Sequence, residues 1–193
     1  MTLQAFVFKN RGLLLSLPAA ALAIFGRPSA RSVALGLPLA IAGELVRCWA
    51  VGYSGATTRN DAVIAPKLVT GGPYGYVRNP LYIGNFATAA GFAIAFTGKN
   101  SPAVRSALVG GSLAAMAAVY AIIVPHEEAF LRSKFGDEFV RYCERVPRLI
   151  PQLVPSSEPA EAWDPGVLIE AESRTLALFG AMLATLAVKA RGA

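Results

Sequence analysis

Long runs of apolar residues, separated by shorter polar stretches, dominate the hydrophobic pattern of this chain. A transmembrane helix needs about 20 predominantly apolar residues. The runs predict membrane-spanning helices over residues 12–26, 33–53, 80–97, 104–124 and 173–189. Four spans with one surface-lying or re-entrant segment is the alternative that the pattern leaves open. We therefore expect an all-α integral membrane protein of about five transmembrane helices, forming one domain over residues 1–193.

Two long polar segments interrupt the apolar runs, at residues 54–79 and 126–174. The first two spans are joined by a short link, and so are the third and fourth, which predicts two tight hairpins. Both long segments then fall on the same face of the membrane. Lys and Arg are more frequent on this face than on the other, so the positive-inside rule places it in the cytoplasm. We expect a protein of the cytoplasmic membrane.

Composition agrees with a membrane protein and excludes several other classes. Apolar residues make up 54% of the chain, and only 16% of residues are charged, whereas soluble domains carry about 25%. The pI near 9.6 does not predict a nucleic-acid partner, because the basic residues flank apolar runs, as expected for contact with anionic lipid. Two cysteines and one histidine are too few for a disulfide framework or a zinc centre, so we expect no metal.

The polar stretch GGPYGYVRNPLYIGN, residues 71–85, stands directly before the third predicted span. Asn79 is a favourable N-cap residue, and Pro80 suits the first position of a helix. The free N–H groups and the positive dipole end of that helix could bind an anionic group such as a carboxylate. The alternative interpretation is an ordinary turn at the membrane interface, with a belt of tyrosines and a helix cap.

A second polar stretch, HEEAFLRSKFGDEFVRYCERVPRLIP, covers residues 126–151. Aromatic and aliphatic residues recur in it at three- and four-residue spacing, which predicts two short helices at the membrane surface. Gly136 would separate them and Asp137 would cap the second. Glu127 and Glu128 directly follow the fourth predicted span, where carboxylates tend to have cationic partners. Alternatively, they only add negative charge to a helix N-terminus.

Glu44 and Arg47 are ionisable residues within the second predicted span. They stand three residues apart, so they share one face of the helix and could pair. Ionisable residues within a span usually face the interior of a helix bundle. The pair could line a cavity for substrate or cofactor, or it could only lock the packing of the helices.

Taken together, the two polar stretches resemble a known family. GGPYGYVRNPLYIG is similar to the Gly, Tyr and Arg-His-Pro-x-Tyr-x-Gly signature of a family of integral membrane methyltransferases, which includes isoprenylcysteine carboxyl methyltransferases and phospholipid N-methyltransferases. The stretch from His126 to Pro151 is similar to their Glu-Glu, Phe-Gly, Tyr and Arg-Val-Pro tail. The resemblance covers about residues 65–151. It implies a helical, cytosolic catalytic segment towards the C-terminus and methyl transfer from S-adenosyl-L-methionine without a Rossmann domain.

The resemblance also implies roles for residues of both stretches. The cofactor contacts it implies are Val69, Tyr74, Asn79, Pro80, Tyr82 and Glu127. The groups that would support the cofactor or face the substrate are Arg78, Glu128 and Tyr142. To these we add Glu44 and Arg47 as substrate-side residues, and His126 or Glu128 as the proton acceptor that an amine substrate would need. His126 could instead only cap the membrane boundary.

Two departures from the family pattern leave the methyl acceptor open. Asn79 stands where the family has histidine, and Ile123 stands where the prenylcysteine enzymes have an arginine assigned to substrate. The acceptor classes that we expect are a lipid amine, a prenylated or other lipophilic carboxylate, and a small apolar thiol or acid. A membrane reductase of the sterol reductase type, which would bind NADPH, and a non-catalytic membrane scaffold are the rival interpretations. The oligomeric state stays open.

Overall fold

The computed structural model describes residues 2–55, 65–156 and 162–192, and over these residues the chain forms helices and loops without a strand. Six α-helices and one turn of 3₁₀ helix follow in chain order: α1 (Leu3–Phe25), α2 (Ala30–Ser54), η2 (Gly72–Gly75), α3 (Pro80–Phe96), α4 (Pro102–Phe135), α5 (Asp137–Arg145) and α6 (Gly166–Arg191). The all-α class that the hydrophobic pattern predicts is confirmed.

Four of these helices, α1, α2, α4 and α6, are long and apolar enough to cross a membrane. The chain is therefore an integral membrane protein. α3 is also apolar but has only 17 residues. At 1.5 Å per residue it is about 26 Å long, somewhat less than the roughly 30 Å of a bilayer's hydrocarbon core. A full fifth crossing stays a prediction.

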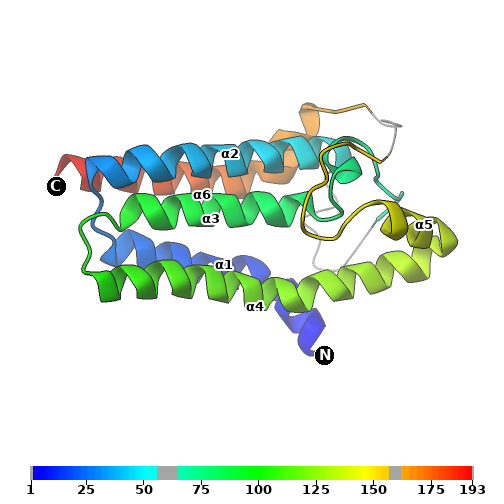
Figure 1. Cartoon of the computed structure of the whole chain (residues 1–193), viewed down its shortest axis with the longest axis horizontal. Helices are drawn as coiled ribbons and strands as arrows, with labels where there is room; N and C mark the ends of the chain where they lie inside the picture. Colours follow the sequence, from blue (N-terminus) through cyan, green and yellow to red (C-terminus); the bar gives the residue numbers. More distant parts are fainter. Residues whose placement is uncertain (1, 56–64, 157–161, 193) are drawn as a thin grey trace.

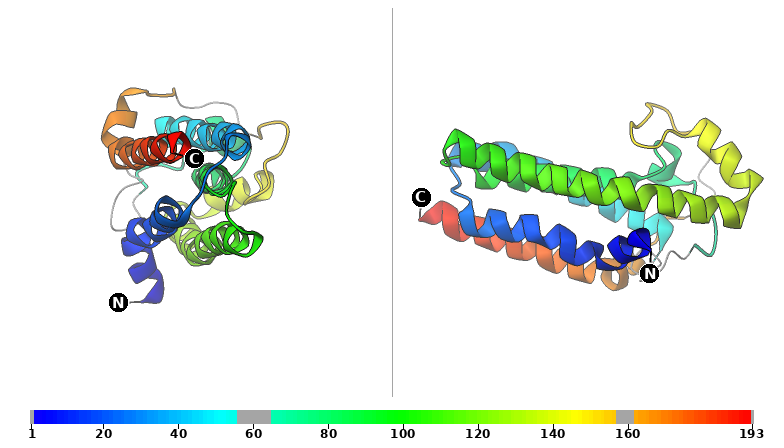
Figure 2. Two further views of the ribbon diagram at one scale, coloured as in Figure 1. Left: turned by 90° about the vertical axis from the view of Figure 1, so that its left-hand side faces the viewer. Right: turned by 90° about the horizontal axis from the view of Figure 1, so that it is seen from below.

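The five helices other than α5 lie side by side along one axis (Figures 1 and 2). α3 is the central helix, because it contacts α1, α2, α4 and α6. The α1–α2 and α3–α4 links turn at one end of this bundle, where the C-terminus also lies (Figure 1). α5 and the described parts of both long polar segments lie at the opposite end, which we call the polar end. Residues 56–64 and 157–161 of those segments lie outside the described residues.

Glycines allow α2 and α3 to pack with their backbones almost in contact. Gly36 and Gly43 of α2 face Gly91 and Gly84 of α3, and the spacing is seven residues on each helix. A Cβ added at Gly43 would lie 2.6 Å from the carbonyl oxygen of Gly84, and one added at Gly84 would lie 2.8 Å from that of Gly43. Small residues at such spacing are typical of helix pairs in membranes, where close packing drives association.

α4 does not end where the sequence predicts. The fourth span was expected to stop at residue 124 and a separate surface helix to follow, but α4 continues through Pro125 as far as Phe135. A proline is tolerated within a membrane helix because neighbouring groups satisfy the backbone carbonyl that it leaves unbonded. Glu127 and Glu128 therefore belong to the last turns of a 34-residue helix, not to a helix N-terminus.

The break at Gly136 is confirmed, with a φ of +51° that favours glycine. The predicted cap is wrong, because Gly136 itself occupies the N-cap position of α5 and Asp137 is the first helical residue. The apolar face of α5 also does not face the membrane surface. Phe139 and Tyr142, together with Val146, are almost fully buried in a small core against Leu131 and neighbouring residues.

After α5 the chain runs back over the segment that precedes α3 as an extended strap, which we define as residues 146–156. The backbone N–H of Gln152 donates to the carbonyl of Tyr76 at 3.1 Å, and its side-chain amide donates to the carbonyl of Gly75 at 2.9 Å. The N–H of Ser156 donates to the same Gly75 carbonyl at 2.9 Å. The strap thereby ties the end of α5 to the turn that opens α3.

Candidate functional site

The glycine-rich turn, residues 71–79, shapes the start of α3. Gly72 has a φ of +55°, and a Cβ there would collide with the ring of Tyr53 from α2. Asn79 and Pro80 occupy the N-cap and first helical positions, as predicted. The side chain of Asn79 does not cap the helix, however; it donates to the carbonyl of Arg148 in the strap at 3.1 Å. The side chain of Asn79 thus binds the strap to the start of α3.

Arg78 joins the glycine-rich turn to α4 and to the end of α5. Its Nε donates to the Glu128 carboxylate at 3.1 Å. Its Nη1 donates to two backbone carbonyls, of Cys143 at 3.1 Å and of Val146 at 2.7 Å. Its backbone N–H donates to the carbonyl of Pro147 at 2.9 Å. A guanidinium group presents several donors in a fixed fork, so one side chain can hold three separate segments.

Glu128 is the acidic partner at this junction. It accepts hydrogen bonds from Arg78 and also from Arg148 of the strap, and its own side chain is only 13% exposed. Hydrogen bonding to Glu128 raises the pKa of Arg148 above its usual value. Glu128 thus pairs with two guanidinium groups, and it connects α4 to the glycine-rich turn and to the strap.

Tyr142 of α5 fixes the backbone of the glycine-rich turn. Its hydroxyl donates to the carbonyl of Tyr74 at 2.8 Å. Burial raises the pKa of Tyr142 well above its usual value, so the phenol stays a neutral hydrogen-bond donor. Tyr74 is thereby held at the cavity wall by a contact from a residue 68 positions later in the chain.

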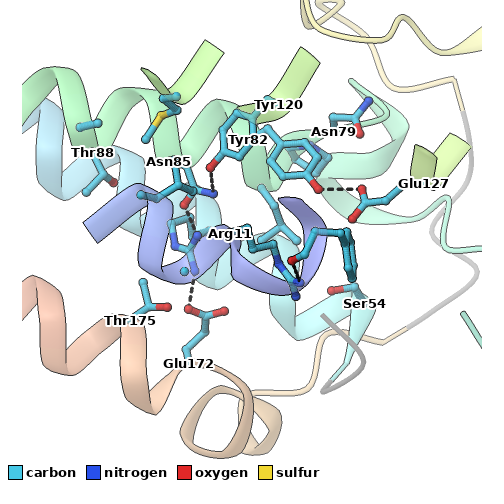
Figure 3. A pocket seen from close by; sticks show the side chains of 18 of the residues that line it. Arg11, Ser54, Asn79, Tyr82, Asn85, Thr88, Tyr120, Glu127, Glu172 and Thr175 are labelled. Carbon is cyan, nitrogen blue, oxygen red and sulfur yellow. Dashed lines mark hydrogen bonds and ion pairs between the residues drawn. The ribbon is translucent and has the colours of Figure 1, made fainter. Parts of the chain in front are cut away.

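Tyr82 and Glu127 form the polar pair that lies closest to the start of α3. The Tyr82 hydroxyl donates to Oε2 of Glu127 at 2.7 Å. The Tyr82 ring in turn packs on Tyr120 of α4, with ring centroids 4.3 Å apart. The first turn of α3 and the last part of α4 are therefore in direct contact, although the two residues are 45 positions apart in the sequence. Figure 3 shows this pair at the cavity wall.

A cavity of about 620 Å³ lies within this framework. It is large enough for a cofactor or a drug-sized ligand, since such sites measure about 300–1,000 Å³. It extends from the polar end into the bundle, and α1, α2, α3, α4 and α6 all contribute to its wall. The residues predicted from the sequence that line it are Glu44, Arg47, Val69, Tyr74, Arg78, Asn79, Pro80, Tyr82, Glu127, Glu128 and Tyr142.

His126 is the one predicted site residue that is not part of this lining. Its ring packs edge-on against Phe8 of α1, with centroids 6.1 Å apart. His126 thus contacts α1 from α4, and the alternative that it caps the membrane boundary stays a prediction. This contact gives no support to His126 as a proton acceptor.

A second polar cluster, which we call the inner network, lies deeper in the bundle. The Arg47 guanidinium donates to Asn85 of α3 and pairs with Glu172 of α6, while its Nε lies 3.4 Å from Glu44. The Asn85 amide donates to the hydroxyl of Tyr120 at 2.7 Å. The predicted Glu44–Arg47 pair is confirmed, and it belongs to a larger arrangement that connects α2, α3, α4 and α6 (Figure 3).

Several residues of the cavity wall were not identified from the sequence, namely Arg11, Asn85, Tyr120 and Glu172. In the sequence, Arg11 stands before the first apolar run and Tyr120 within the fourth, where neither position signals a cavity. Glu172 is the residue of this set that could have been identified from the sequence. It stands at the start of the last apolar run, and a buried arginine in another span calls for acidic partners.

Two curated relatives match part of the chain. Cobalt-zinc-cadmium resistance protein CzcN of Cupriavidus metallidurans is 35% identical over 119 residues, which cover 62% of this chain and 47% of that protein. Protein-S-isoprenylcysteine O-methyltransferase B of Arabidopsis thaliana is 31% identical over 120 residues, which cover 60% of this chain and 57% of that protein. The chain thus spans about half the length of the curated relatives it matches. No solved structure matches it significantly.

A protein family also matches this chain, over a range that can be placed on the fold. Residues 32–138 correspond to the phospholipid methyltransferase family, and this range is more than half of the chain. It runs from the start of α2 to the start of α5, so it contains the glycine-rich turn, the Tyr82–Glu127 pair and the ion pair between Arg78 and Glu128. By this match, the chain belongs to the phospholipid methyltransferase family of membrane proteins, as the two polar stretches of its sequence indicate.

Proposed function

We propose that this chain is an S-adenosyl-L-methionine-dependent methyltransferase that acts on a lipophilic or membrane-borne acceptor. Family membership supports methyl transfer in general terms. The observation that carries the proposal is that the two polar stretches line one cavity, where Tyr82 donates to Glu127 at 2.7 Å. The same cavity continues between apolar helices, where a lipophilic acceptor can be held.

The residues at the polar end fit the chemical groups of S-adenosyl-L-methionine. Glu127 can accept hydrogen bonds from an ammonium group or from ribose hydroxyls. The start of α3, at Asn79 and Pro80, suits a carboxylate. The faces of Tyr74 and Tyr82 suit a flat base or a cationic sulfonium. The side chain of Arg78 is already engaged with Glu128 and two carbonyls, so its role is to hold the wall of the site.

S-adenosyl-L-methionine, when bound, supplies an electrophilic methyl group, whose transfer to a nucleophile leaves the sulfur as a neutral thioether. Such an in-line displacement depends on alignment and on exclusion of water. This chain provides alignment through the rigid contact of α3 with α4. The strap, which the Arg78 side chain and the Gln152 backbone hold at the polar end, fixes the turn from which α3 begins.

Isothermal titration with S-adenosylhomocysteine in detergent tests the proposal, with Glu127→Gln as the test variant and Glu138→Gln, on the exposed side of α5, as the matched control. We expect Glu127→Gln to weaken binding by about 1–3 kcal/mol, because a charge-assisted bond is lost in a buried site. The control should bind like the parent protein.

Titration with NADPH in parallel separates the rival functions. Binding of NADPH without binding of S-adenosylhomocysteine would replace the proposal by a reductase function. Failure to bind either compound would favour a non-catalytic membrane protein, and equal affinity of the two glutamate variants would remove Glu127 from the cofactor site.

A further inference from the structure

Four large apolar side chains of the strap are exposed, although the strap itself is firmly attached to the protein. They are Leu149, Ile150, Leu153 and Val154, with exposed fractions of 54%, 81%, 98% and 73%, and we call them the apolar surface of the strap. Hydrogen bonds from the backbone and the side chain of Gln152 hold the strap between the two pairs. Single exposed apolar residues are common on proteins, but four within six positions form a cluster that calls for a partner.

The strap lies beside the bundle and not on its axis. Both views of Figure 2 place it at the outer edge of the molecule, next to the ends of the long helices. A segment at this edge of a membrane protein borders the surrounding lipid if it lies at the depth of the membrane. The depth of the strap therefore decides what covers its apolar surface.

Two tryptophans at the polar end of α2 indicate this depth. Trp49 and Trp163 are about half-exposed, and the indole of Trp163 lies against Gly52 of α2. Tryptophan is enriched where a membrane meets water. The Tyr76 ring packs against Trp49, with ring centroids 6.0 Å apart, and the Tyr76 carbonyl accepts from Gln152 of the strap at 3.1 Å. The middle of the strap therefore lies at the depth of the membrane interface.

The charges of the strap and of the residue before it suit a layer of lipid headgroups. Residues 145–156 include two arginines, Arg145 and Arg148, and no acidic residue. Both arginines are exposed, although Arg148 also pairs with Glu128. A long basic side chain can lay its apolar stem against lipid and keep its charge among the headgroups. The exposed acidic residues of this region belong to α5 and precede the strap.

We infer that the apolar surface of the strap inserts into the interfacial layer of the membrane leaflet at the polar end. Its partner is the lipid of the surrounding bilayer. The buried side chains of α5, Phe139 and Tyr142, are covered by protein and are not available for this contact. The Arg148 carbonyl of the strap accepts from Asn79, so lipid that holds the strap also steadies the start of α3. The inference concerns attachment to lipid and does not depend on the proposed methyl transfer.

A fluorescent label on the strap tests this contact. In a background with Cys48 and Cys143 replaced by serine, Leu153→Cys is labelled with the environment-sensitive fluorophore NBD and placed in nanodiscs that hold one copy each. We expect emission at shorter wavelength than in water, and quenching by lipids that carry a nitroxide on the acyl chain, because an interfacial segment places its apolar groups near the acyl boundary. Ser133→Cys, at an exposed position near the end of α4, is the matched control and should show neither effect.

The emission also distinguishes lipid from other partners. Emission typical of water at Leu153→Cys would overturn the lipid contact. A shift to shorter wavelength without quenching by the lipid nitroxide would overturn it too, since protein would then cover the strap. Ile150→Cys reports on the same surface should the first variant fail to fold. None of these measurements requires S-adenosylhomocysteine, so failure of the proposed function would leave the result unchanged.

A second measurement uses cleavage by trypsin after Arg148 in nanodiscs. Leu153→Asp should be cleaved faster than the parent protein, because a carboxylate is unfavourable in the apolar part of a membrane and would draw the strap out of it. Leu153 is 98% exposed, so the substitution removes almost no contact with protein. Ser133→Asp is the matched control and should be cleaved like the parent protein. Equal cleavage of Leu153→Asp and the parent protein would contradict the inference.

Discussion

Arg78 and Arg47 are both nearly enclosed, but they hold different kinds of partners. Arg78 donates mainly to backbone carbonyls at the polar end, and its one carboxylate, Glu128, is shared with Arg148. Arg47 is surrounded by side chains, two of them acidic. The first arginine therefore shapes the backbone around the cavity, whereas the second joins side chains of α2, α3 and α6 at the cavity wall.

Arg78→Lys keeps the charge but removes the fork of donors that joins three segments. We expect it to lower the free energy of unfolding by about 1–3 kcal/mol, because the carbonyls of Cys143 and Val146 lose their charged donor. The strap should also become more susceptible to trypsin at Arg148. Thermal unfolding and limited proteolysis in detergent measure the two effects.

Arg132→Lys, at an exposed position of α4, is the control for this change and should behave like the parent protein. Equal trypsin resistance of the two variants would mean that Arg78 does not hold the strap.

For single residues, the sequence is a good guide to which side chains line the cavity. It is a poorer guide to the contacts that each of these side chains makes. Asn79 was expected to cap α3, but its amide bonds the strap, because a partner 69 residues away competes with the local cap. Of the inner network, the sequence predicted only the pair of Glu44 and Arg47, because their three-residue spacing is visible within one helix. Asn85 and Glu172 belong to the inner network through contacts between helices. No local sequence pattern predicts such contacts.

The α2–α3 pair is the element on which the rest of the site is built. Its close packing places Arg47 of α2 directly against Gly84 of α3, where a Cβ would lie 2.7 Å from the Arg47 Cγ. Larger residues at these glycines would push the helices apart and displace the guanidinium from Asn85 on α3. The glycines therefore allow α2 and α3 to associate closely, and this close packing also positions the inner network.

Gly43→Ala tests this packing. The new Cβ would lie 2.6 Å from the carbonyl oxygen of Gly84, so we expect a loss of about 1–3 kcal/mol of stability from overpacking. Gly110→Ala in α4 is the matched control, because a Cβ there meets nothing within 4 Å. It should be neutral or stabilising by up to about 1 kcal/mol, as expected for alanine in a helix.

Unfolding of both variants in detergent gives the comparison. A loss of stability at Gly110 equal to that at Gly43 would show that the loss at Gly43 does not come from its contact with α3.

Among the elements, the start of α3 and the break at Gly136 could be predicted, because proline at the first helical position and a glycine between two apolar patterns are strong local signals. The continuation of α4 through Pro125 could not. In water a proline normally interrupts a helix, whereas within a bundle the neighbouring helices can support the altered turn. α5 was assigned to the membrane surface because its amphipathic pattern does not tell whether protein or lipid covers the apolar face.

For the whole molecule, the two hairpins place the polar end and the C-terminus at opposite ends of the bundle (Figure 1). We predict that the polar end faces the cytoplasm and that the C-terminus lies on the other side of the membrane. In a background with Cys48 and Cys143 replaced by serine, Ser133→Cys should react with a membrane-impermeant maleimide only in inside-out vesicles. Ala190→Cys should react only in right-side-out vesicles.

Detergent-solubilised protein, in which both cysteines should react, controls for accessibility. Labelling of the two positions from the same side would contradict a full crossing of the membrane by α6. Labelling of both with the opposite preference would reverse the predicted orientation.

The contact between Arg47 and Glu172 has a consequence for how the protein is made. The two residues are 125 positions apart, and α6 leaves the ribosome after α1 to α5. Until α6 inserts, the Arg47 charge lies in the nascent bundle without its acidic partner from that helix. Insertion of α6 then adds Glu172 as a second acidic partner of Arg47 and supplies the α6 part of the cavity wall. A chain whose synthesis stops before α6 therefore lacks one wall of the cavity and one of the two acidic partners of Arg47, and keeps Glu44 as the other.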